Sequence, residues 1–195
     1  YAGWLNDHPM LISVMQATYG SLTGFSIVAF IAVALLGSQR ACKEFSFLFV
    51  VLAVTVSVLG IFFPAYGPAV HFRDIIANMA NIDDYGWDHV PIYNQLRSGA
   101  PGVLQLERLL GLTTFPSFHT AMGILLVYAL RERWVTIVPA AAYSGVMLAG
   151  TPLFGSHYFV DLLAGALLTA AAIATVRLCF APSRPFSPLA PLPTA

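Results

Sequence analysis

Charged residues, lysine and cysteine are all scarce in this sequence. Only 9% of the 195 residues are charged, whereas 58% are hydrophobic, and the mean hydropathy is +0.77. A soluble globular domain carries about 25% charged residues, so the composition argues against an ordinary soluble fold. With two cysteines and no Cys/His cluster, the sequence also gives no indication of a structural zinc site.

Long apolar stretches take the place of charged surface. A helix that crosses a bilayer needs about 17–25 predominantly apolar residues. Five stretches are interpreted as spans: Met10–Gly37, Phe45–Phe63, Phe118–Leu130, Trp134–Phe154 and Tyr158–Phe180. The third stretch is short, so we expect it to begin earlier or to lie partly in a protein-lined cavity. The sequence therefore predicts an all-α, polytopic membrane helical bundle.

The basic residues predict which side of the membrane each loop faces. Six of the nine Lys and Arg residues lie at span ends on one side: Arg40, Lys43, Arg131, Arg133, Arg177 and Arg184. Short basic loops face the cytoplasm in membrane proteins. We therefore expect an integral protein of a bacterial inner membrane, with the long 64–117 loop on the extracytoplasmic side. Cys42 and Cys179 fall at predicted cytoplasmic ends, where thiols stay reduced.

A single membrane-embedded domain is expected over residues 1–181. The segment 182–195 is rich in proline, which does not continue a helix, so we expect a flexible cytoplasmic tail. The chain begins at Tyr1 rather than Met, and a further span before it would bring the total to six. Small residues such as Gly165 would allow close helix packing, either within one chain or between chains.

The first of two histidine motifs runs Phe115-Pro116-Ser117-Phe118-His119-Thr120-Ala121. Pro116 interrupts any preceding helix, and Ser117 is a favoured N-cap residue. A capped helix start has free backbone N–H groups and a positive dipole end, which together bind an anion such as phosphate. His119 would lie in the first turn beside that anion. The alternative is a cap with an interfacial histidine and no ligand.

The second motif runs Gly155-Ser156-His157-Tyr158-Phe159-Val160-Asp161, and it too has a turn residue and a cap candidate, Ser156. His157 and Asp161 are four residues apart, so on a helix they share one face. The carboxylate could then bond one imidazole nitrogen and leave the other as a basic nucleophile. An acid within a span is costly unless it is paired. The alternative is a purely structural His–Asp pair. Both motifs lie on the predicted extracytoplasmic side.

Together, Phe115–Ala121 and Gly155–Asp161 resemble the second and third signature motifs of the type 2 phosphatidic acid phosphatase superfamily. One helical hairpin separates the two histidines, as in that superfamily. Within that superfamily, the residues of both motifs are most similar to those of the branch that includes inositol phosphorylceramide synthases. The motif resemblance covers roughly residues 115–165, and the pattern of spans is consistent with it.

The resemblance implies a phosphoryl transfer that uses neither a metal nor a cofactor. His157 would attack the phosphorus of a lipid phosphoester and form a phosphohistidine, while Asp161 orients its ring. His119 would protonate the departing oxygen and then help to deprotonate the incoming water or alcohol. Ser117, Ser156 and nearby backbone N–H groups would hold the nonbridging oxygens of the phosphate.

Two cations of the family pattern, the lysine of the first motif and the arginine of the third, are missing from their expected places. The common phosphatase form has a Lys and then Arg-Pro in its first motif, and Ser-Arg at the start of its third. Here the single lysine lies on the opposite side, and Gly150 and Thr151 occupy the Ser-Arg positions. Arg97, between the second span and the Ser117 helix, is the best-placed substitute, and Arg108 and Arg73 follow. Arginine suits phosphate because its guanidinium donates two parallel hydrogen bonds. The alternative for Arg97 is a solvated charge paired with a nearby acid. The Pro64–Pro68 segment is expected to shape the pocket mouth.

These observations leave three functions open. A transferase would move a phospho-headgroup from a phospholipid to a lipid alcohol, and the missing cations and the motif wording favour it. A phosphatase would use water as the acceptor. A catalytically silent membrane protein would bind lipid or a partner through the same pocket. The expected partners are the bilayer and a phospholipid or lipid phosphate, with no nucleic acid.

Overall fold

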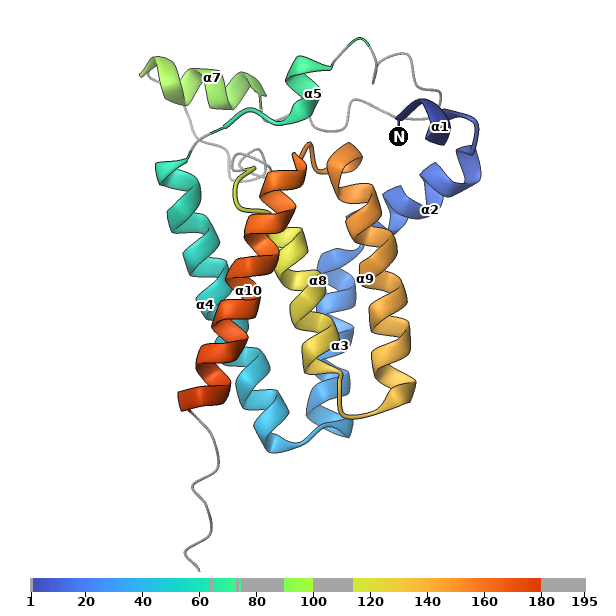
Figure 1. Cartoon of the computed structure of the whole chain (residues 1–195), viewed down its shortest axis with the longest axis vertical. Helices are drawn as coiled ribbons and strands as arrows, with labels where there is room; N and C mark the ends of the chain where they lie inside the picture. Colours follow the sequence, from blue (N-terminus) through green and yellow to red (C-terminus); the bar gives the residue numbers. More distant parts are fainter. Residues whose placement is uncertain (1, 64, 73, 75–89, 100–113, 180–195) are drawn as a thin grey trace, which may run out of the picture.

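The computed structural model describes residues 2–63, 65–72, 74, 90–99 and 114–179. Within these residues every regular element is a helix (Figure 1). The helices are α1 (Ala2–Asn6), α2 (Pro9–Gly20), α3 (Leu22–Leu36), α4 (Gln39–Phe62), α5 (Pro68–His71), α7 (Val90–Ser98), α8 (Phe118–Ala129), α9 (Trp134–Phe154) and α10 (Phe159–Cys179). The predicted all-α fold is confirmed for this part of the chain. The 182–195 segment and most of the 64–117 loop lie outside the described residues.

Three helices, α4, α9 and α10, are each long and apolar enough to cross a membrane. α2 and α3 together would make a fourth span, but the pair is bent by 60° at the break between them. α8 is apolar but has only 12 residues. The described residues therefore contain three candidate spans, or up to four with the bent pair, and the count of five stays a prediction.

The Met10–Gly37 stretch, predicted as one span, is divided at Ser21. This residue ends α2 and precedes α3, with φ −87° and ψ 4°. Its hydroxyl donates to the carbonyl oxygen of Thr18 at 3.1 Å. A side chain that bonds to the backbone in this way competes with the helical hydrogen-bond ladder and can bend a helix. The apolar pattern gave no sign of this bend, because apolar residues continue on both sides of it.

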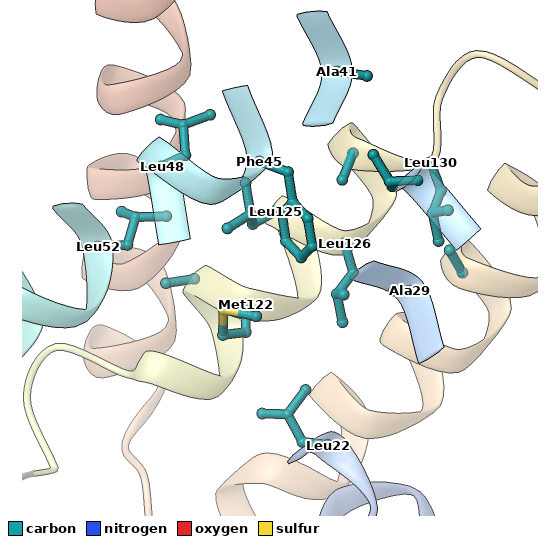
Figure 2. Close-up of a cluster of buried hydrophobic side chains, with 14 of the residues drawn as sticks. Leu22, Ala29, Ala41, Phe45, Leu48, Leu52, Met122, Leu125, Leu126 and Leu130 are labelled. Atoms are coloured by element: carbon teal, nitrogen blue, oxygen red, sulfur yellow. The ribbon is translucent and has the colours of Figure 1, made fainter. Parts of the chain in front are cut away.

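The short helix α8 lies inside the bundle, where it contacts α3, α4, α9 and α10. Met122, Leu125 and Leu126 of α8 are at most 1% exposed. Figure 2 shows them among buried side chains contributed by α3 and α4: Leu22, Ala29, Ala41, Phe45, Leu48 and Leu52. The third apolar stretch is therefore enclosed by other helices. Because protein rather than lipid surrounds α8, this helix does not need the full length of a membrane span.

The outward faces of the longer helices are apolar and exposed. Six large side chains on α3, α4 and α10 are each more than half exposed: Ile27, Val28, Phe47, Val54, Leu163 and Leu167. Water would disfavour an apolar surface of this extent, whereas the hydrocarbon of a bilayer accepts it. Together with the apolar spans, these faces identify an integral membrane protein.

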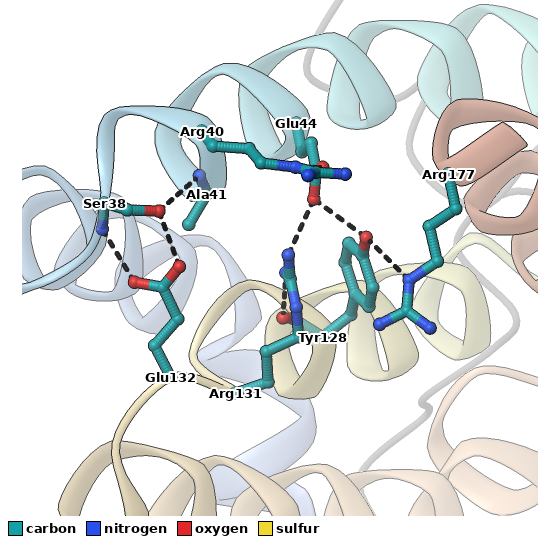
Figure 3. Close-up of polar contacts among 8 residues, drawn as sticks. All are labelled: Ser38, Arg40, Ala41, Glu44, Tyr128, Arg131, Glu132 and Arg177. Atoms are coloured by element: carbon teal, nitrogen blue, oxygen red, sulfur yellow. Dashed lines mark hydrogen bonds and ion pairs between the residues drawn. The ribbon is translucent and has the colours of Figure 1, made fainter. Parts of the chain in front are cut away.

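At one end of the bundle, Ser38 bonds the segment that connects α3 to α4 to the segment that connects α8 to α9 (Figure 3). The Ser38 hydroxyl accepts a hydrogen bond from the backbone N–H of Ala41 and so caps α4. The same hydroxyl and the Ser38 backbone N–H donate to the two carboxylate oxygens of Glu132, at 2.5 and 2.7 Å. These contacts hold the α3–α4 link against the α8–α9 link.

A second polar cluster at the same end surrounds the carboxylate of Glu44, which is only 5% exposed. Arg40 and Arg131 each donate to it at 2.7 Å, and the Tyr128 hydroxyl donates at 2.8 Å (Figure 3). Arg177 of α10 donates in turn to the Tyr128 hydroxyl at 3.4 Å. A buried charge is tolerated only when it is paired and hydrogen-bonded, so these partners are the reason that α4 can carry an acid here.

Candidate active site

Both histidine motifs lie at the end of the bundle opposite to the Glu44 cluster. α8 begins, α9 ends and α10 begins at this end (Figure 1). The backbone N–H of Ser117 donates to the carbonyl oxygen of Asp161 at 3.0 Å, so a hydrogen bond joins the two motifs directly. The fold thus brings together residues that are separated by a complete helical hairpin in the sequence.

Ser117 is the N-cap of α8, as its sequence context predicts. Its hydroxyl accepts a hydrogen bond from the backbone N–H of Thr120 at 3.3 Å, and the residue is fully buried. Gly165 of α10 permits this close packing, because a Cβ at that position would lie 2.4 Å from the Ser117 carbonyl oxygen. This packing fixes the Ser117 cap beside α10. It also fixes the position of the backbone N–H groups in the turn that follows the cap.

His157 and Asp161 form a buried pair, 6% and 3% exposed. The distance from His157 Nδ1 to Asp161 Oδ2 is 3.6 Å, which is too long for a hydrogen bond but within reach of a small ring movement. Asp161 Oδ2 accepts a hydrogen bond from the Tyr158 backbone N–H at 2.8 Å. His157 itself precedes α10, which begins at Phe159. The expectation that both side chains lie on one helix face is therefore wrong, although the two side chains still meet.

The second histidine, His119, lies in the first turn of α8 and is partly exposed. Its ring centroid is 6.3 Å from that of His157, with 60° between the ring planes. The ring of Tyr19, from α2, stacks on the imidazole of His119, with 4.1 Å between the ring centroids and 12° between the ring planes. Sequence analysis did not identify Tyr19, because a single tyrosine in an apolar stretch does not indicate that it will contact a residue as far along the chain as His119.

Ser156 does not cap a helix as predicted, because α10 begins three residues after it. It has a positive φ of 49°, a conformation that costs energy in any residue other than glycine. Its hydroxyl instead accepts a hydrogen bond from the backbone N–H of Ala69 at 2.9 Å. The turn before His157 is thus held by the segment that follows α4.

Gly67 makes this contact between the two segments possible. A Cβ at position 67 would lie 2.0 Å from the Ser156 carbonyl oxygen and 2.7 Å from the Ser156 Cβ, and a Cβ atom essentially never makes non-bonded contacts this short. The same segment receives a second hydrogen bond, from the Thr114 hydroxyl to the Ala65 carbonyl oxygen at 3.1 Å. The segment at 65–69 therefore packs on the second motif and bonds to Thr114, the residue just before the first motif, in the region where the sequence suggested a pocket mouth.

Arg97 lies at the exposed end of α7. Its Nη1 donates to the Tyr93 hydroxyl at 3.2 Å, and its guanidinium carbon is 5.7 Å from the centroid of the same ring. Tyr93 is uncharged, so this contact does not itself neutralise the positive charge of Arg97. Its role as a phosphate ligand stays a prediction.

The positions that lack the expected Ser-Arg pair are packing positions in this fold. A Cβ on Gly150 would lie 3.2 Å from Met15 Cβ, so α2 and α9 are in close contact there. Thr151 is fully buried, and its hydroxyl donates to the carbonyl oxygen of Met147 in its own helix. A long cationic side chain at either position would have to displace α2 or its neighbours.

Two buried polar atoms beside the site have no hydrogen-bond partner among the described residues, His157 Nδ1 and Thr120 Oγ1. Nearly all buried polar atoms in folded proteins are hydrogen-bonded, so each exception needs an explanation. His157 Nδ1 faces Asp161 Oδ2 at 3.6 Å, just beyond hydrogen-bond distance, whereas Thr120 Oγ1 marks a place where water or a ligand would bind. Thr120 adjoins His119 and was not identified from the sequence. In the described part of the chain, no group of three His, Cys, Asp or Glu side chains could hold a metal ion.

Comparisons with known proteins give one family. No curated protein and no solved structure matches this chain. A family model described as the PAP2 superfamily matches residues 1–175. Because that match spans most of the sequence and includes both histidine motifs, the chain belongs to the PAP2 superfamily.

Proposed function

We propose that this protein is a membrane enzyme that transfers a phosphorus-containing group from a lipid phosphoester through a phosphohistidine on His157. The observation that carries the proposal is the convergence of two imidazoles and a buried carboxylate, with the ring centroids of His119 and His157 6.3 Å apart. Membership of the PAP2 superfamily supports a phosphate-ester substrate. The apolar outer faces of the bundle support a substrate that arrives from the lipid phase.

In the first half-reaction, Nε2 of His157 attacks the phosphorus. A P–N bond forms as the P–O bond to the leaving group breaks, and His119 gives the departing oxygen a proton. Asp161 faces Nδ1 of the nucleophile at 3.6 Å, and such catalytic contacts often shorten only when substrate binds. The carboxylate would then stabilise the positive charge that the His157 ring acquires.

In the second half-reaction, an acceptor hydroxyl attacks the phosphorus and the P–N bond breaks. The proton of the acceptor passes to His119, which is thereby ready for the next cycle. Ser117 and the first-turn N–H groups of α8 would hold the nonbridging oxygens. Ser156, with its hydroxyl already bonded to Ala69, would act by shaping the turn before the nucleophile. Arg97 is the proposed cation.

A lipid alcohol is the proposed acceptor, which makes the protein a phosphotransferase. Two features support this choice: the motif wording of the inositol phosphorylceramide synthase-like branch, and the packing of Gly150 and Thr151 where phosphatases carry Ser-Arg. Water as the acceptor would make it a lipid phosphate phosphatase, with the same nucleophile.

The proposed arrangement in the membrane has five spans, with the histidine end facing outward from a bacterial inner membrane. It is supported by the basic residues at the opposite end of the bundle: Arg40, Lys43, Arg131, Arg133 and Arg177. A membrane-impermeant maleimide should therefore label a Ser98→Cys variant in intact cells. It should label Cys179 only after permeabilisation, and the reverse pattern would overturn the orientation.

The nucleophile is tested by His157→Ala, with His8→Ala as a matched control on an exposed histidine outside the site. Purified protein is incubated with lipid phosphoesters labelled at phosphorus and quenched in alkali, which preserves a phosphohistidine. We expect label on the unaltered protein and on the control, and none on His157→Ala. Labelling of His157→Ala at the unaltered level would remove the nucleophile assignment, and no label on any form would favour the silent membrane protein.

The acceptor is tested with a labelled phospholipid in the presence and absence of a lipid alcohol, such as a ceramide or a diacylglycerol. A transferase gives a new labelled phospholipid whose yield rises with the lipid alcohol. Free phosphate or phospho-alcohol as the sole product, at a rate unaffected by the lipid alcohol, would establish the phosphatase instead.

A further inference from the structure

A groove opens between α4 and α10 at the end of the bundle opposite to the histidines. Its volume is about 540 Å³, within the range of about 300–1,000 Å³ typical of small-molecule sites. The residues that line it are Gln39, Arg40, Lys43, Glu44, Phe47 and Val176. None of these residues belongs to the candidate active site, so the groove needs an explanation of its own.

The polar part of the groove has an excess of positive charge. Its one acid, Glu44, already accepts hydrogen bonds from two guanidiniums, those of Arg40 and Arg131, at 2.7 Å each (Figure 3). Lys43 is exposed, one residue before that acid, and adds a further positive charge. Arg177 follows the lining residue Val176 on α10. An anion entering the groove would therefore meet several cations and a single carboxylate that is already neutralised.

The remaining part of the groove is apolar. Phe47 lies one helical turn after Lys43 on the same face of α4, and it is 52% exposed. Val176 lines the groove from α10. Further along α4, Val50 and Val54 are also more than half exposed. Cations at the mouth followed by an apolar wall along a membrane helix suit an amphipathic anion better than a small inorganic one.

We propose that this groove binds an anionic phospholipid of the surrounding bilayer, as a second lipid site separate from the histidine site. The phosphate would lie between Lys43 and Arg40, and an acyl chain would run along Phe47 and the exposed face of α4. Basic pockets between membrane helices are recognised places for acidic lipid headgroups. A lipid bound there would also hold α4 against α10 near the Glu44 cluster.

The first experiment measures lipid retention by the full-length protein. The protein is transferred from nanodiscs of phosphatidylcholine containing phosphatidylglycerol into the gas phase, and native mass spectrometry counts the bound lipids. Lys43→Gln should reduce retained phosphatidylglycerol about fivefold, as expected for one lysine at a membrane surface, whereas Lys43→Arg should retain it. Arg133→Gln removes a positive charge at the same end but outside the groove, and should behave like the unaltered protein.

Equal retention by Lys43→Gln and the unaltered protein would overturn the proposal, as would equal loss in Arg133→Gln. Complete displacement of the lipid by millimolar inorganic phosphate would mean that the groove binds a small anion instead. Lys43→Gln should reduce retained phosphatidylglycerol by the same factor in a His157→Ala background, because His157 is not among the residues that line the groove and lipid retention there does not require turnover. Failure of the proposed catalytic function would therefore leave this result unchanged.

The second experiment identifies the occupant directly. A photoreactive phenylalanine analogue is placed at position 47, which is exposed within the groove, and the protein is irradiated in the same nanodiscs. The expected product is a covalent adduct with phosphatidylglycerol, reduced when Lys43→Gln is combined with it. A crosslink to residues 182–195 of the same chain, or to a second copy, would show a protein occupant and overturn the proposal.

Discussion

The ring of Tyr19 stacks on the imidazole of His119, with centroids 4.1 Å apart and 12° between the ring planes. The first residue comes from α2 and the second from α8, which are far apart in the sequence. α2 ends at Ser21, where the chain bends by 60° before α3. Because that bend sets the direction of α2, it also sets the position of the ring that packs on the proposed general acid.

Replacing Tyr19 should change catalysis more than stability. In Tyr19→Leu the imidazole of His119 loses its stacking partner, and an aromatic pair is worth about 0.5–1.5 kcal/mol, so we expect kcat to fall about tenfold. Tyr19→Phe keeps the stack and is expected to keep most of the activity. The measurement is the steady-state rate with a lipid phosphoester across pH, beside a thermal melt. If both variants turn over at the unaltered rate, the stack has no part in positioning His119.

Asp161→Asn should remove the negative charge of Asp161 while keeping the hydrogen bond that its side chain makes to the backbone. An asparagine oxygen can still accept the Tyr158 N–H that now binds Asp161 Oδ2 at 2.8 Å, so the start of α10 should be preserved. The negative charge that would stabilise the His157 imidazolium is lost, and we expect kcat to fall about a hundredfold or more. Rapid-quench trapping of the phosphohistidine measures the affected step. A normal rate of its formation in a well-folded Asp161→Asn would assign the pair a purely structural role.

Gly67→Ala should disturb the turn that precedes His157, although residue 67 is far from that turn in the sequence. The added methyl group would lie 2.0 Å from the Ser156 carbonyl oxygen, so the 65–69 segment must move and its hydrogen bond to Ser156 weakens. We expect a loss of about 1–3 kcal/mol in stability and a clear loss of activity. Gly24→Ala is the matched control, because a Cβ there has nothing within 4 Å. Thermal melts and initial rates of the two variants in the same detergent provide the comparison, and an unchanged Gly67→Ala would contradict the packing described.

The contact between Ser38 and Glu132 should make stability depend on acid pH. Hydrogen bonds from the Ser38 hydroxyl and backbone N–H hold the pKa of the Glu132 carboxyl below its ordinary value. A lowered folded-state pKa stabilises the protein above the unfolded pKa of about 4.3, and this stabilisation is lost as pH falls through the folded pKa.

The comparison that tests this dependence is a series of thermal melts of Glu132→Gln and the unaltered protein between pH 3 and pH 7. The unaltered protein should be more stable near neutral pH by a small amount, about 0.5 kcal/mol, because Glu132 is exposed. That advantage should disappear at the acid end of the series. A constant difference at every pH would show that ionisation of Glu132 does not contribute.

Much of the site could be predicted because its signals are local. Ser117 caps α8 for a reason contained in the neighbouring residues, since a serine after a proline and before an apolar stretch favours a helix start. His157 and Asp161 meet because only one turn of chain separates them. The arrangement around Ser156 could not be predicted in the same way. Its hydroxyl binds Ala69, a residue far away in the sequence, in place of a neighbouring helix N–H.

The sequence by itself determined that the chain is an apolar, all-helical membrane protein with two histidine motifs, because composition and short-range spacing follow directly from residue identity. Only the tertiary structure decided how the first apolar stretch bends, which ring packs on His119 and which segment holds the turn before His157. These features arise from contacts between residues distant in the chain. Hydrophobic periodicity indicates which face of a helix is apolar, but it does not indicate which other helix that face packs against.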